Sequence, residues 1–195
     1  MVSDLNTVSA FQIGGDGSLV TVTGSPFSTA STAGFASSIG LAMDPAGKFL
    51  FVSDHMAQAI VPFSVSGTGS LTAVSTLPTS ASSCSVSCHS NPLRLTVHPN
   101  SQFAYASNVQ AGTVSAFKIT NGVLSPGAAD MAAGQHPFGV ALDPMGQFLF
   151  AVNKVDNTIS AFSVDMTTGA LSTVSGSPFS GSLNAPTDIV VVAMQ

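Results

Sequence analysis

Few side chains in this sequence can perform chemistry, and their spacing matches no known catalytic pattern. There are one Arg, four His, two Cys and nine Asp, but no Glu. Arg94 is a candidate anchor for an anionic ligand, because a guanidinium holds a carboxylate or phosphate through two parallel hydrogen bonds. Its alternative role is a structural pair with Asp188. Asp188 itself and His136 are the other two candidate ligand contacts. No Ser/His/Asp triad or acidic pair stands out, so no catalytic residue is assigned.

The two cysteines lie in a serine-rich stretch and raise three alternatives. Cys84, Cys88 and His89 would give zinc only three ligands, whereas structural zinc sites use four, so no metal site is predicted. A short disulfide between Cys84 and Cys88 is favoured, and free thiols are the alternative. Because disulfides persist in oxidising compartments, the pair favours an extracytoplasmic location, periplasmic or secreted. No signal peptide is visible at the N-terminus.

Internal repeats determine how these residues are placed. Three segments align without gaps, MDPAGKFLFVSD (43–54), VHPNSQFAYASN (97–108) and LDPMGQFLFAVN (142–153). The repeat period is about 45–54 residues, and such a period with four short strands is typical of a β-propeller blade. His98 occupies the place of Asp44 and Asp143, so it is predicted to hold a turn. An Asp or Asn recurs where the second strand ends, which predicts a structural role for Asp4, Asp54, Asn108 and Asn153.

Each repeat is predicted to form a four-stranded antiparallel blade. The innermost strands are expected at 38–43, 92–97 and 137–142. The fold class is therefore an all-β propeller with about four blades' worth of sequence. The predicted divisions are a partial blade over 1–26, complete blades over 36–78, 91–128 and 136–178, and a terminal innermost strand over 186–193.

The two ends of the chain leave two arrangements open. Residues 1–4 match part of a second strand, and residues 185–195 match a first strand. The last strand could pair with the first strands and close a four-bladed ring. Alternatively, the chain is part of a larger propeller, which the shortened second strand favours. An open arc would expose blade edges and faces, so self-association through them is expected.

The composition excludes several classes of partner. Lys and Arg together number four and the net charge is −5, so the chain has little to neutralise phosphates, and nucleic-acid binding is excluded. Its longest apolar runs fall far short of the roughly 20 residues of a membrane-spanning helix. The glycine clusters at 14–17 and 67–69 precede no predicted helix, so no phosphate-cradling loop and no cofactor are predicted.

The blade pattern resembles the lactonase-type family of seven-bladed propellers, which includes 6-phosphogluconolactonase-like proteins and is related to YVTN-repeat proteins. The resemblance rests on the x-DP-x-G-x-F-L-F-V hairpin and on GSPF at 24–27 and 176–179. In catalytic members, one blade reads P-R-H-L-x-F-H-P-x-G-x-F-x-Y-V-x-N-E. Here Leu93 stands in place of its Arg, Arg94 in place of its His, and Val109 in place of its Glu. A second catalytic blade would have histidine where this chain has Phe138 and Gly139.

The resemblance implies lactone hydrolysis as the family activity, but the catalytic set is incomplete in this sequence. The expected function is a binding or scaffold module, with a small anionic or sugar-derived ligand in the channel. Its candidate contacts are Arg94, Asp188 and His136. The alternative is a lactonase of the 6-phosphogluconolactonase type whose active site requires additional blades. A third hypothesis is a surface protein that contacts a partner through Ser/Thr-rich loops at 28–38, 79–91 and 175–185.

Overall fold

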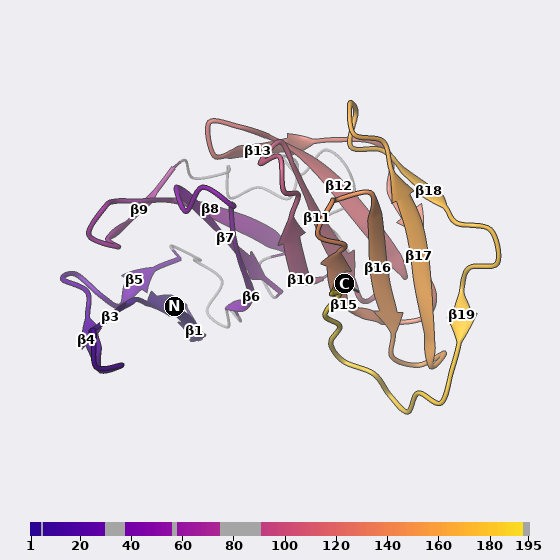
Figure 1. Ribbon diagram of the computed structural model, residues 1–195, viewed down its shortest axis with the longest axis horizontal. Coiled ribbons are helices and arrows are strands. Elements are labelled where there is room, and N and C mark those ends of the chain that lie inside the picture. Colours follow the sequence, from indigo (N-terminus) through magenta and orange to yellow (C-terminus); the bar gives the residue numbers. More distant parts are fainter. Residues whose placement is uncertain (5, 30–37, 56–57, 75–90, 193–195) are drawn as a thin grey trace.

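The computed structural model describes residues 1–4, 6–29, 38–55, 58–74 and 91–192. In these parts the chain forms strands and no helix, and its antiparallel sheets fan out in an arc (Figure 1). No helix among the described residues could therefore cross a membrane. The predicted all-β propeller class, built from four-stranded antiparallel blades, is confirmed.

Three sheets have sequential strand order and correspond to complete blades. Blade 2 contains β6 (Ser38–Met43), β7 (Phe49–Asp54), β8 (Ala59–Val65) and β9 (Leu71–Ala73). Blade 3 contains β10 (Pro92–Val97), β11 (Phe103–Asn108), β12 (Thr113–Thr120), β13 (Val123–Pro126) and β14 (Met131–Ala132). Blade 4 contains β15 (Pro137–Leu142), β16 (Phe148–Asn153), β17 (Thr158–Val164), β18 (Leu171–Thr173) and β19 (Phe179–Ser180). The predicted innermost strands thus coincide with β6, β10 and β15.

Blade 1 is a partial blade that lacks an innermost strand. It consists of β1 (Val2–Asp4), β2 (Thr7–Ser9), β3 (Phe11–Ile13), β4 (Leu19–Thr21) and β5 (Phe27–Ser28). The strand order β1-β2-β5 leaves β1 at the edge of its sheet.

The terminal segment differs from its predicted form. Residues 186–192, which were expected to be an innermost strand, are not a strand in the structure. They nevertheless lie beside β15, because a Cβ atom added at Gly139 would be 2.7 Å from the Cα atom of Asp188. A strand requires a partner's N–H and C=O groups, and among the described residues this segment pairs with no other strand, including β1. The arc is therefore open.

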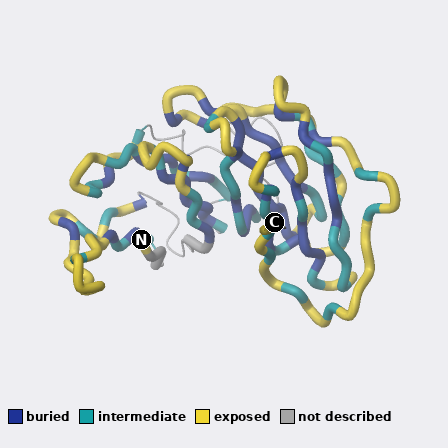
Figure 2. Tube along the Cα trace, viewed as in Figure 1, coloured by how far each residue is buried: buried dark blue, intermediate teal, exposed yellow. Residues whose placement is uncertain are grey.

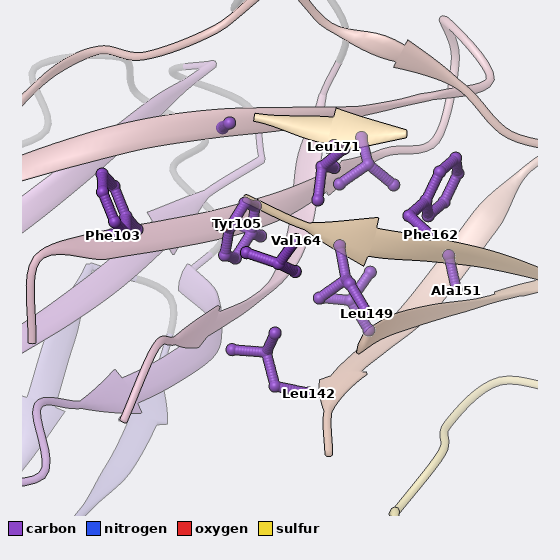
Figure 3. Close-up of a cluster of buried hydrophobic side chains, with 11 residues drawn as sticks. Phe103, Tyr105, Leu142, Leu149, Ala151, Phe162, Val164 and Leu171 are labelled. Carbon is purple, nitrogen blue, oxygen red and sulfur yellow. The ribbon is translucent and has the colours of Figure 1, made fainter. Parts of the chain in front are cut away.

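The hydrophobic cores lie between blades. Figure 2 shows the buried positions concentrated along the central strands. The cluster between blades 3 and 4 brings Phe103 and Tyr105 of β11 together with Phe162, Val164 and Leu171 (Figure 3). Because blades 2 and 3 are covered on both faces, their strands are apolar on both sides. This packing explains the low content of charged residues.

Polar side chains hold the turns that follow the innermost strands. Oδ1 of Asp44 accepts the backbone N–H groups of Lys48 and Phe49, both at 2.6 Å. His98 performs the equivalent task, because its Nδ1 accepts the N–H of Asn100 at 3.1 Å. The proton of this buried imidazole therefore lies on Nε2, which is 3.0 Å from the carbonyl oxygen of Gly146 in the next blade. The predicted turn role of His98 is confirmed.

The side chains that end the second strands are structural as well. The amide nitrogen of Asn108 donates to the hydroxyls of Thr113 and Ser115, at 3.0 and 2.7 Å. Asn153 makes the same pair of bonds to blade 4, with Thr158 and Ser160, at 2.9 Å each. The prediction that these residues are structural is thus confirmed for both asparagines.

Candidate functional site

The candidate ligand contacts are positioned by the innermost strands, which serine hydroxyls join from blade to blade. The Ser53 hydroxyl accepts the N–H of Gly40 and donates to the carbonyl of Leu93 on the next blade, both at 2.8 Å. Ser107 repeats this bridge. Its hydroxyl accepts the N–H of Arg94 at 3.3 Å and donates to the carbonyl of Phe138 at 2.6 Å.

These bridges fit at irregularities in the strand pairing. The register of β6 with β7 shifts between Ser38 and Gly40, and that of β10 with β11 shifts between Pro92 and Leu95. A shifted register leaves backbone groups that the ladder does not pair, and the serine hydroxyls satisfy them. The sequence carried a signal for this feature, because Ser recurs one residue before the end of the second strand in two of the three aligned segments.

Arg94 and Asp188 belong to one row of equivalent positions that crosses the innermost strands. The row runs through Gly40, Arg94, Gly139 and Asp188. A Cβ atom at Gly40 would lie 3.2 Å from the Cα atom of Arg94, so the backbones approach closely at this level. Arg94 is half-buried and Asp188 is exposed, and the strand β15 lies between the two segments that carry them. Oδ1 of Asp188 accepts the N–H of Ile189 at 2.9 Å.

His136 lies at the start of β15 and is exposed. Its φ of 53° falls in the left-handed region, as do those of Asn91 and Ala185 at the same place in two other repeats. Because the conformation recurs, it is a property of the fold and not a mark of a special site. The His136 carbonyl accepts the backbone N–H of Lys154 at 3.0 Å.

Lys154 is a basic residue at this end of the strands that the sequence reasoning missed. Its Nζ lies 4.4 Å from the centroid of the Phe138 ring, a cation–π contact. Ser107 ties the backbone of Phe138, the residue that Lys154 contacts, to the backbone of Arg94. The sequence carried a signal for Lys154, because it directly follows the aligned segment 142–153.

The positions at which the family resemblance calls for Arg and Glu are apolar and buried. Leu93 and Val109 are 6% and 8% exposed. Neither side chain can bind an anion or transfer a proton. Residues equivalent to Val109 in the other blades are His55 and Lys154. Nδ1 of His55 is buried and has no hydrogen-bond partner within the described ranges.

Two further titratable groups have perturbed environments. Burial raises the pKa of the half-buried Asp130 above its ordinary value of 3.8, and a hydrogen bond with Ser115 opposes this shift. Burial also raises the pKa of Tyr105, whose hydroxyl donates to the carbonyl of Gly169 in the next blade at 3.0 Å. Cys84 and Cys88, the predicted disulfide pair, lie outside the described residues.

Repeated four-stranded blades whose innermost strands lie side by side define a β-propeller. Residues 67–187 match the family described as "Lactonase, 7-bladed beta-propeller". The chain therefore belongs to this lactonase family. No curated protein matches the chain significantly.

Solved structures support the same fold. A candidate 6-phosphogluconolactonase from Bacteroides uniformis is 26% identical with a TM-score of 0.67, and the match covers 86% of this chain and 50% of that one. The periplasmic gluconolactonase of Pseudomonas aeruginosa is 22% identical with a TM-score of 0.66, over 86% and 49% of the two chains. A protein from Lactobacillus plantarum is 22% identical with a TM-score of 0.70, over 87% and 48%. The chain thus spans about half the length of these structures.

Proposed function

We propose that the chain is a binding module that takes a small anionic, sugar-derived ligand at the end of the innermost strands where Arg94 lies. The observation that carries the proposal is a contrast between neighbouring positions. Leu93 and Val109 are apolar and buried, which disfavours hydrolysis, whereas Arg94 is half-buried and carries a full charge. A site of this kind can hold an anion without supplying an acid or base.

The distribution of charge supports an anionic ligand. The chain has a net charge of −5, yet Arg94 lies on the innermost strand β10, and the Nζ of Lys154 lies over the ring of Phe138 on the neighbouring innermost strand β15. His136 precedes the strand that lies between Arg94 and Asp188. A guanidinium in a half-buried position binds a carboxylate or phosphate more strongly than it would in open water, because the local dielectric is lower.

Calorimetric titration tests this proposal, with 6-phosphogluconate and gluconate as the probes and glucose as the uncharged control. We expect the two anions to bind and Arg94→Ala to weaken them at least about tenfold, because the paired hydrogen bonds are lost. Arg94→Lys should restore only part of the affinity. Lys118→Ala is the matched control, because Lys118 is an exposed cation on β12. Absence of anion binding, or equal binding by Arg94→Ala, would contradict the proposal.

Lactone hydrolysis is the second candidate, and the family match with its gluconolactonase neighbours favours it. The assay follows hydrolysis of glucono-δ-lactone and 6-phosphogluconolactone above the uncatalysed rate. Turnover that disappears in Arg94→Ala would replace the binding proposal with an enzymatic one. Ligand binding without turnover would support the binding module. An extracytoplasmic location is also proposed, and it rests on the pair Cys84 and Cys88.

A further inference from the structure

The sequence has one asparagine that is followed by glycine, and the structure places this pair at the tip of a hairpin. Asn121 and Gly122 form the two-residue turn between β12 and β13, and the residues on either side, Thr120 and Val123, pair with each other. The φ values of 51° at Asn121 and 77° at Gly122 are those of a type I′ turn. Asn121 is exposed, so water reaches its side-chain amide.

An asparagine followed by glycine can lose its side-chain amide without an enzyme. The backbone nitrogen of Gly122 attacks Cγ of Asn121, the bond from Cγ to the amide nitrogen breaks, and ammonia leaves with the proton of the glycine N–H. Water then opens the five-membered succinimide at either of its two carbonyls, which gives aspartate or isoaspartate. Glycine favours the attack because it has no Cβ to crowd its nitrogen.

Hydrogen bonds hold the side chains of other exposed asparagines, but not that of Asn121. Oδ1 of Asn100 accepts the backbone N–H of Gln102 at 2.9 Å, and Oδ1 of Asn157 accepts that of Ala185 at 2.6 Å. Each of these carboxamides must give up its hydrogen bond before its carbon can be attacked. Asn121 has no such bond to any residue that the structure describes. Its carboxamide is therefore the freest of the three to react.

The ring of Phe49, on β7 of blade 2, restrains the turn from the other side. Gly122 is buried, and no Cβ atom would fit at it because the Phe49 ring lies directly against its backbone. A type I′ turn keeps ψ of its first central residue near about 30°. Succinimide closure requires the Gly122 nitrogen to rotate toward Cβ of Asn121, well away from that value. The ring against Gly122 opposes this rotation.

We propose that Asn121 is a site of spontaneous deamidation and that the packing of Phe49 on Gly122 sets the rate of the reaction. The reaction proceeds only from conformations in which the turn between β12 and β13 has opened. Its isoaspartate product lengthens the main chain by one atom, and the lengthened turn no longer fits beneath the ring. The product therefore weakens the contact between blades 2 and 3 beside the apolar cluster on which Phe49 packs.

Incubation of the protein at pH 8 and 37 °C, followed by tryptic peptide mapping, tests the site. Cleavage after Lys118 puts Asn100 and Asn121 in different peptides, and a zero-time sample corrects for reaction during digestion. We expect aspartate and isoaspartate at Asn121 well before any at Asn100. A synthetic peptide of residues 117–126 should react at least about tenfold faster than the protein, because nothing holds its turn closed. Product at Asn100 first, or equal rates in protein and peptide, would overturn the proposal.

A matched pair of variants tests the control by the ring. Phe49→Leu should raise the rate at Asn121 at least about threefold, because the turn opens more often. Phe103→Leu is the control, since the Phe103 ring lies against Gly169 in the same way at the next blade interface. Both substitutions remove a ring, so general destabilisation would raise the two rates together. A rate in Phe49→Leu no higher than that in Phe103→Leu would contradict control by the ring.

Thermal melts test the effect of the product on the blades. The isoaspartate form, separated by ion exchange, should melt below Asn121→Asp, which has the same charge on an unaltered main chain. Asn121→Asp should melt close to the wild type, because Asn121 is exposed. Equal melting temperatures for the isoaspartate form and Asn121→Asp would overturn the inferred coupling between the turn and the blade contact.

Discussion

At the scale of single residues, two aspartates show how environment sets the sign of a pH effect. Burial raises the pKa of Asp130, so the folded protein binds this proton more tightly than the unfolded chain does. Stability then falls as the pH rises from about 3.8 through the folded pKa. Hydrogen bonds from Thr168 and Thr167 lower the pKa of Asp165. The stability that Asp165 contributes is present above about pH 3.8, and it disappears as the pH falls through the pKa of the folded protein.

Thermal melts of two isosteric variants test these signs. At pH 7, Asp130→Asn should melt above the wild type, because it removes a charge that burial disfavours. Asp165→Asn should melt below the wild type, because it removes a charge that backbone N–H groups stabilise. At pH 3 both differences should shrink, since the wild-type Asp130 is then protonated and Asp165 is approaching its own pKa. Shifts of the same sign in both variants at pH 7 would contradict this account.

At the scale of elements, the serine bridges tie one innermost strand to the next. Ser107→Ala would leave the Arg94 N–H and the Phe138 carbonyl without this hydroxyl at a buried position. We expect the free energy of unfolding to fall by about 1–3 kcal/mol, the usual cost of an unsatisfied buried group. Urea denaturation measures the change. The control Ser125→Ala removes an exposed hydroxyl and should change the free energy by less than about 0.5 kcal/mol.

The elements also show what local sequence can and cannot predict. The innermost strands were predictable because apolar runs end at Asp-Pro or His-Pro turns, and β6, β10 and β15 match the predicted ranges. The Ser107 bridge and the contact between Lys154 and Phe138 were missed, because they join segments far apart in sequence. Residues 186–192 have the pattern of a strand but pair with no strand among the described residues, and pairing is a property of the assembled sheet.

The candidate ligand site stays a prediction, but the row of positions that carries two of its residues was predictable. Alignment of the repeats placed Arg94 and Asp188 at equivalent positions, and the structure puts both positions in one row across the innermost strands. The alignment could not show that Asp130 is half-buried, or that Lys154 lies over the Phe138 ring. Those facts depend on how the blades stack, which no single repeat specifies.

At the scale of the whole molecule, buried contacts tie each blade to the next, so the described blades should unfold together. Tyr105 lies in the apolar cluster between blades 3 and 4, and its hydroxyl donates to the carbonyl of Gly169 at 3.0 Å. Tyr105→Phe keeps the ring but leaves this buried carbonyl without its donor, so we expect the free energy of unfolding to fall by about 1–3 kcal/mol. Urea denaturation measures the change, and Ser163→Ala, which removes an exposed hydroxyl, is the control. An unchanged free energy in Tyr105→Phe would mean that the hydrogen bond between the two blades adds nothing to the apolar contact.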